Sequence, residues 1–88
     1  MALEFEWDAA KSRANRRKHG VEFEEAMTVF EDPSSLEIAD PDHSVVEARY
    51  VLLGRSRSGR LLTVIHTDRG ATIRLIGARP ASWRERLT

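Results

Sequence analysis

The second half of the chain consists of short apolar runs separated by turn residues. Four of these runs are rich in Leu, Ile and Val, at residues 35–39, 48–54, 61–67 and 73–78. A basic Ser/Gly-containing loop at 55–60 joins the second run to the third, and Asp68-Arg69-Gly70 forms a tighter turn before the fourth. Because short turns join antiparallel neighbours, the pattern predicts an antiparallel β-sheet meander.

The first twenty residues predict a short strand followed by a basic helix. Phe5 and Trp7 alternate with glutamates, which is the period of a strand with one buried face. Asp8 is suited to cap a helix, and Gly20 can adopt the left-handed turn that ends one. The helix predicted at 9–18 has five basic residues and few apolar ones, so we expect it to pack thinly.

Two further helices are predicted, one before the meander in the sequence and one after it. The first has four apolar residues at i, i+3, i+4 and i+7 and stops before Pro33; these four, which we expect in the core, are Phe23, Ala26, Met27 and Phe30. The second lies at 81–88, with Ser82 and Glu85 at the spacing of a capping box.

The elements predict one α+β domain spanning residues 1–88, a small antiparallel meander with two N-terminal helices and a short C-terminal helix. A chain of 88 residues is too small to enclose a deep cavity. We therefore expect chemistry in a surface groove and a polymer or protein as the substrate.

Composition excludes several classes of site and location. The chain has no cysteine, and its three histidines are too scattered for a zinc signature, so no metal and no cofactor is expected. No apolar run approaches the roughly 20 residues of a membrane span, and the N-terminus does not resemble a signal peptide. A cytoplasmic protein without membrane contact is the expectation.

The charges sum to zero but are sorted along the chain. Residues 20–47 contain nine acidic residues and no Lys or Arg, whereas residues 48–88 contain nine arginines against Asp68 and Glu85. Arginine offers a planar donor fork that matches two phosphate oxygens, and an acidic segment suits a basic partner. Solvated surface charge is the alternative explanation for both.

Three residues of the last two runs are candidates for phosphodiester chemistry. Alternation places His66 at the end of the apolar face of its strand, where it is either a general acid or base or a core-rim histidine satisfied by a hydrogen bond. Arg74 and Arg79 have opposite parity, so they share a face only if the strand bulges, which Gly77 would tolerate, or ends before Arg79. Guanidinium groups there could stabilise the charge of a phosphorane without a metal, or could simply be solvated.

Further candidates lie nearby in the sequence. Glu47 is either a base or the ion-pair partner of an arginine, and Arg49 and Arg84 could extend the basic cluster. Trp83 is either a core anchor of the last helix or a stacking platform for an unpaired base. Lys18 and its basic neighbours in the helix at 9–18, together with the loop at 55–60, could add salt-sensitive contacts to an RNA backbone.

Together these residues resemble the BrnT family of ribonuclease toxins of type II toxin–antitoxin systems. The resemblance spans nearly the whole chain and rests on Phe5-x-Trp7-Asp8, Lys11, Asn15, Lys18-His19-Gly20-Val21-x-Phe23-x-x-Ala26, Val29-Phe30, Glu47-x-Arg49, Gly54, Leu62-x-Val64-x-x-Thr67 and Arg74-x-Ile76-x-Ala78-Arg79.

The resemblance implies a RelE-like fold and a metal-independent endoribonuclease that inhibits translation and growth. It also implies a hetero-oligomer with a DNA-binding, BrnA-like antitoxin that neutralises the toxin and carries it to operator DNA. It assigns the site to Glu47, Arg49, Arg74 and Arg79. Our hypothesis is that His66 and Glu47 transfer protons while the two strand arginines hold phosphate.

Two departures from the family pattern are consistent with a weakened nuclease, if the missing tail belongs to the active groove. Relatives commonly have Ser where this chain has Gly77, and continue to a terminal Tyr that is missing here. A catalytically degenerate binding module, kept as the antitoxin's partner and co-repressor, is therefore the alternative function. A structural subunit without RNA contact is a third, and it predicts no salt-dependent RNA binding.

Overall fold

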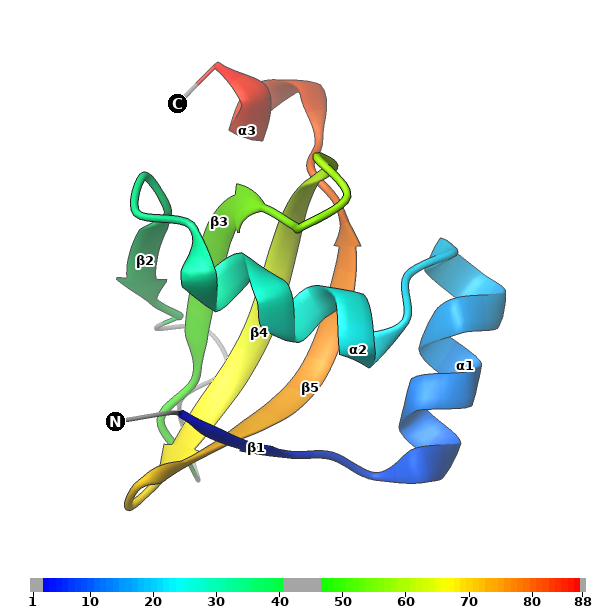
Figure 1. The fold of residues 1–88 in the computed structure, drawn as a ribbon, viewed down its shortest axis with the longest axis vertical. Helices are drawn as coiled ribbons and strands as arrows, with labels where there is room; N and C mark the ends of the chain where they lie inside the picture. The colour runs from blue at the N-terminus through cyan, green and yellow to red at the C-terminus, as the bar shows by residue number, and fades with distance from the viewer. Residues whose placement is uncertain (1–2, 41–46, 88) are drawn as a thin grey trace.

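The computed structural model describes residues 3–40 and 47–87. The elements follow one another as β1 (Glu4–Glu6), α1 (Ala9–His19), α2 (Phe23–Ala26), the 3-10 helix η1 (Met27–Glu31), β2 (Leu36–Ala39), β3 (Tyr50–Arg55), β4 (Leu61–Arg69), β5 (Thr72–Pro80) and α3 (Trp83–Arg86). Figure 1 shows α2 lying across one side of the sheet, α1 beside β5, and α3 beyond the end of the strands. The prediction of a small α+β domain is confirmed.

The sheet is mixed rather than purely antiparallel. Its strand order is β1-β5-β4-β3-β2, and β2 to β5 pair antiparallel in sequence, as the turn residues predict. The N-terminal strand β1 instead pairs in parallel with β5, matching Glu4 with Thr72 and Glu6 with Arg74. A parallel pair needs a long connection, and here the helices and the whole meander supply it.

The predicted second helix is tighter than expected. It begins as α2 for one turn and continues as η1, which has three residues per turn. Phe23, Ala26 and Val29, which are spaced by three, are fully buried, whereas Met27 and Phe30 are only partly buried. The inward-facing stripe therefore follows the 3-10 period and includes Val29, which a period of 3.6 did not select.

The core lies between this helical segment and one face of the sheet. Leu62 and Val64 of β4, Leu52 of β3, and Leu75 and Ala78 of β5 complete it. The opposite side of the sheet, which we call the open face, carries the residues of the other parity. Among the described residues no helix lies across that face; α3 borders only its end.

Helix α1 packs thinly, as its composition predicts. None of its residues is buried, and it lies against the part of β5 that β1 leaves uncovered (Figure 1). The side-chain amide of Asn15 forms two hydrogen bonds with the backbone of Ala78 in β5. Its Nδ2 donates to the Ala78 carbonyl at 2.8 Å, and its Oδ1 accepts from the Ala78 amide at 3.1 Å. Asp8 and Gly20 cap the helix as predicted.

Candidate functional site

A bulge in β5 places Arg74 and Arg79 on the same face of the sheet. The register shifts between Ile65 and His66, so that Ile65 faces Gly77 while His66 faces Leu75. The extra residue reverses the alternation, and both arginines then occupy open-face positions. This is the bulge that the opposite parity of the two arginines requires, and it lies beside the predicted glycine.

The two arginines lie at different ends of this face. Arg79 pairs in register with Thr63, and Arg74 with Thr67. These partners are four positions apart, which corresponds to about 13 Å along β4. This backbone spacing is suited to two phosphates of one extended strand, each bound by one of the two guanidinium groups.

Arg79 forms a bidentate ion pair with Glu85 of α3. Nη1 and Nη2 lie 2.7 Å and 3.0 Å from the two carboxylate oxygens. The hydrogen bonds from Arg79 lower the pKa of Glu85 to about 2, and the pair raises the pKa of Arg79 above its usual value. Glu85 also accepts from the amide of Ser82, which completes the predicted capping box.

Arg84 and Trp83 lie on the same short helix. The Arg84 guanidinium lies 5.3 Å from the centre of the Trp83 ring, a cation–π distance. Trp83 is 68% exposed, so the prediction of a core anchor is wrong and the ring is free to contact a partner. The helix buries none of its four residues.

The Arg74 end of the open face holds a second set of charges. Arg74 lies 3.6 Å from a carboxylate oxygen of Glu6 on the neighbouring strand. Glu47 accepts from Arg69 Nε at 3.1 Å, and this bond, with a smaller contribution from Arg49, lowers the pKa of Glu47. A carboxylate with a lowered pKa is a weak proton acceptor, so the contacts of Glu47 favour its role as an ion-pair partner.

His66 lies on the helix-covered side of the sheet, away from both arginines. The residue is 1% exposed, and its ring stacks on Tyr50 and contacts the edge of Phe30. Its Nε2 lies 2.7 Å from Glu37 and its Nδ1 lies 3.0 Å from Asp68. The structure therefore does not bring His66 together with Arg74 and Arg79, and both ring nitrogens already have partners.

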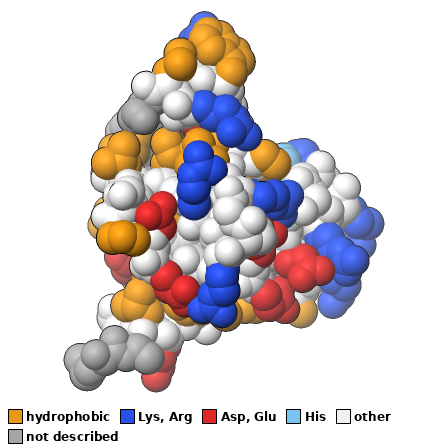
Figure 2. All heavy atoms as spheres, turned by 45° about the horizontal axis from the view of Figure 1, so that its top comes forward, with side chains coloured by type: hydrophobic (Ala, Val, Ile, Leu, Met, Phe, Trp, Pro, Cys, Tyr) orange, Lys and Arg blue, Asp and Glu red, His pale blue; other side chains and the backbone are white. Residues whose placement is uncertain are grey.

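Lys18 lies in the exposed last turn of α1. Figure 2 shows Lys and Arg side chains gathered over the part of the molecule formed by α1, at the right of the view. These charges stabilise the C-terminal end of the helix dipole. They form a basic surface of their own, beside β5 rather than on the open face.

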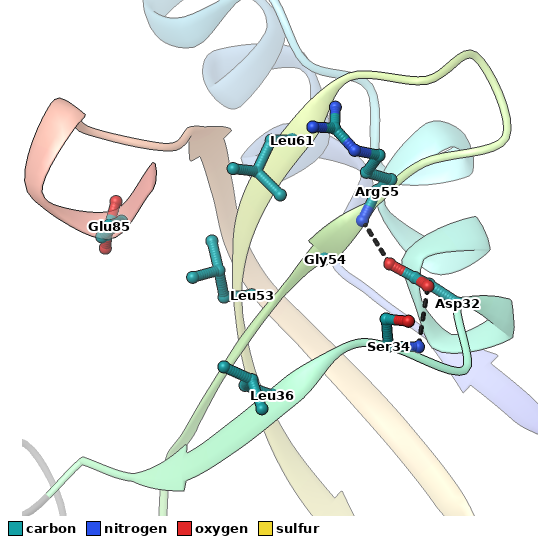
Figure 3. Close-up of a pocket in the computed structure, with 8 residues that line it drawn as sticks. All are labelled: Asp32, Ser34, Leu36, Leu53, Gly54, Arg55, Leu61 and Glu85. Atoms are coloured by element: carbon teal, nitrogen blue, oxygen red, sulfur yellow. Dashed lines mark hydrogen bonds between the residues drawn. The ribbon is translucent and has the colours of Figure 1, made fainter. Parts of the chain in front are cut away.

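The open face has an apolar floor between its charged ends. Val51, Leu53 and Ile65 are half-buried there. Near α3 the floor deepens into a pocket of about 270 Å³, lined by Leu36, Leu53, Leu61, Glu85 and residues of the adjoining turns. Figure 3 shows the three leucine side chains extending toward the side on which Glu85 lies.

Thr63 and Glu85 are the candidate residues that the sequence did not indicate as part of a site. In the sequence, Thr63 is one residue of an apolar β run, and helix capping is a sufficient explanation for Glu85. Only the pairing of Thr63 with Arg79 in the sheet, and the turn that returns α3 toward that arginine, bring the three residues together.

No helix of the described residues is long and apolar enough to cross a membrane. No curated protein matches the chain in sequence. Among solved structures, the Brucella abortus ribonuclease toxin BrnT has the same fold, with a TM-score of 0.67 at 21% sequence identity over 92% of this chain and 99% of that chain.

The family model for the ribonuclease toxin BrnT of type II toxin–antitoxin systems matches residues 7–85, and therefore covers all but the two ends of the chain. The matched range contains the motif residues of α1, α2 and β5, including Arg74 and Arg79. The chain therefore belongs to the BrnT family of ribonuclease toxins of type II toxin–antitoxin systems.

Proposed function

We propose that the chain is an endoribonuclease that works without a metal and binds single-stranded RNA along its open face. The observation that carries this proposal is the position of Arg74 and Arg79 on one exposed side of the sheet, made possible by the bulge in β5. The spacing of about 13 Å along the strand suits two phosphates of one extended chain. The apolar floor between them offers contact to unpaired bases.

In this proposal Arg79 binds the scissile phosphodiester. A guanidinium fork matches two phosphate oxygens and stabilises the charge that grows on phosphorus as the 2′-hydroxyl attacks. Arg74 and Arg49 hold a neighbouring phosphate, while Lys18 and Arg84 add contacts at the rim. The burial and pairing of His66 support a structural role for that residue, in place of the proton transfer suggested by the sequence.

The proposed partner is a DNA-binding antitoxin similar to BrnA, in a cytoplasmic hetero-oligomer that reaches operator DNA only through the antitoxin. Exposed apolar side chains support a protein partner: Leu36 and Ile38 on β2 are 50% and 65% exposed, and Leu87 after α3 is 78% exposed. A RelE-like mode of translation inhibition belongs to the same proposal.

The test is RNA cleavage by the purified chain, free of antitoxin, in EDTA. We expect the native chain to cut labelled RNA and Arg79→Ala to lose at least a hundredfold in rate, since one lost transition-state donor costs about that much. Arg57→Ala is the matched control, because Arg57 also pairs with a carboxylate, its Nη2 donating to both oxygens of Glu31. Glu31 ends η1 on the helix-covered side of the sheet, so Arg57 in the loop at 55–60 lies away from the open face.

Three outcomes separate the candidate functions. Cleavage lost in Arg79→Ala but kept in Arg57→Ala supports the proposed site. Equal cleavage by all three proteins would remove Arg79 from it. Intact RNA with every folded protein would favour ribosome-dependent cleavage or the degenerate binding module, which the pairing of Arg79 with Glu85 in the free chain also favours.

A further inference from the structure

The Glu85 carboxylate contacts Arg79 in the way a phosphate would. Its two oxygens accept from the two terminal nitrogens of one guanidinium group, at 2.7 Å and 3.0 Å. Arginine uses this fork for carboxylates and phosphates alike. With a pKa of about 2, Glu85 is an anion throughout the neutral range.

A buried hydroxyl next to this ion pair makes no well-formed hydrogen bond to any described residue. Thr63 is 1% exposed, and its Oγ1 makes no hydrogen bond within the part of the chain that the structure describes. It lies directly opposite Arg79 in the sheet and faces Glu85, at a geometry too poor for a full hydrogen bond but close enough to contribute, after Arg79 and Ser82, to the lowered pKa of that carboxylate. A poorly made hydrogen bond in a buried position is costly, so this hydroxyl is a donor that a better-placed acceptor would satisfy.

The helix that carries Glu85 is held loosely. None of the four residues of α3 is buried, and its exposed Trp83 and the following Leu87 contribute little packing. The chain just before the helix is anchored by the bond from the Ala81 amide to the Leu61 carbonyl. Moving Glu85 away from Arg79 would therefore cost mainly the ion pair and the capping box.

We propose that Arg79 and Thr63 form a phosphate subsite and that Glu85 fills this subsite in the free protein. An RNA phosphodiester enters by displacing the carboxylate, taking both prongs of the Arg79 fork and the Thr63 hydroxyl. The C-terminal helix is then an internal competitor of the substrate. This inference rests on the proposed function, since it places the RNA phosphate on the open face.

The test measures binding of a short fluorescein-labelled oligonucleotide of 2′-O-methyl RNA, which cannot be cut by attack of a 2′-hydroxyl. Glu85→Gln removes the competing charge while keeping a residue that completes a capping box. We expect binding to tighten about two- to fivefold, the range of an ion pair near the surface. In this background Thr63→Val should weaken binding about tenfold, because a bond from a hydroxyl to a charged group is lost.

Glu25→Gln is the matched control for the change in net charge. Glu25 also has a pKa of about 2 and also pairs with an arginine, Arg60, but it lies in the α2 segment on the other side of the sheet. We expect Glu25→Gln to change binding less than about twofold. Urea unfolding of each variant confirms that the fold is kept.

The outcomes distinguish failure of the subsite from failure of the proposed function. Equal tightening by Glu85→Gln and Glu25→Gln would mean that only net charge matters, and weaker binding by Glu85→Gln would mean that Glu85 orients Arg79 for substrate. Either result overturns the proposal, provided that Arg79→Ala still weakens binding of the same oligonucleotide. If Arg79→Ala binds as well as the native chain, the proposed RNA site itself is wrong.

Discussion

The hydrogen bonds of Asn15, which link α1 to β5, give the sharpest test of how this small fold is stabilised. Asn15 makes three hydrogen bonds: Nδ2 donates to the carbonyls of Val21 and Ala78, and Oδ1 accepts from the Ala78 amide. Because α1 buries none of its own residues, little packing is available to replace them. Asn15→Ala would strand backbone groups of two residues that are themselves buried.

The expected loss of stability follows from the number of hydrogen bonds that Asn15→Ala removes. At a net value of roughly 0.5–1.5 kcal/mol for each of the three, Asn15→Ala should lower the free energy of unfolding by about 2–4 kcal/mol. Asn15→Asp keeps the acceptor for the Ala78 amide but turns a carboxylate oxygen toward two carbonyls. It should therefore be at least as destabilising at neutral pH.

Urea unfolding followed by circular dichroism measures these changes, with Arg17→Ala, an exposed change on the same helix, as a control expected within about 0.5 kcal/mol of the native chain. The reasoning is refuted if Asn15→Ala is as mild as this control. It is also refuted if Asn15→Asp is as stable as the native chain, since the donor bonds would then contribute nothing.

Three further predictions concern packing, pH and the buried histidine. Gly54→Ala should destabilise the fold by about 1–3 kcal/mol in thermal unfolding, because a β-carbon there would lie 2.9 Å from Val29 Cγ1; an unchanged melting temperature would contradict this. Hydrogen bonding by Arg60 lowers the pKa of Glu25 from 4.5 to about 2, so its stabilisation is complete above about pH 4.5 and is lost as pH falls toward 2. Between about pH 5 and pH 3 the native chain should lose about 1 kcal/mol more than Glu25→Gln, the full shift being discounted for solvent screening at the exposed arginine, and parallel pH profiles in urea titrations would refute this. His66→Phe should keep the fold and the RNA cleavage rate, because the ring packs among aromatic residues away from the open face; loss of cleavage in a folded variant would restore its catalytic role.

The sequence predicted those parts of the fold that depend on local signals. Turn residues around Gly59 and Gly70 determine the hairpins, and both glycines have the positive φ that such turns require. The parallel position of β1 could not be predicted, because it depends on which sheet edge remains free once the meander has formed. Nor could a 3-10 period be told from 3.6 over a segment as short as 23–31.

The site was predictable only in part, for a physical reason. Alternation placed His66 with Leu62 and Val64, and an apolar strand face is the one that helices cover, so this pattern already favoured burial. The shared face of Arg74 and Arg79 depended on a bulge that the sequence allowed but did not require. The Arg79 contact with Glu85 depends on the path of the chain after Pro80, which no periodicity encodes.

The most direct test of the account is to map where RNA binds on the folded chain. Two-dimensional NMR spectra of the labelled protein, titrated with 2′-O-methyl RNA, report this residue by residue. We predict shifts on the open face, at Thr63, Ile65, Arg74 and Arg79, with little change at Phe30. Shifts confined to the surroundings of Phe30, or to the exposed side of α1, would contradict the assignment of the open face as the RNA site.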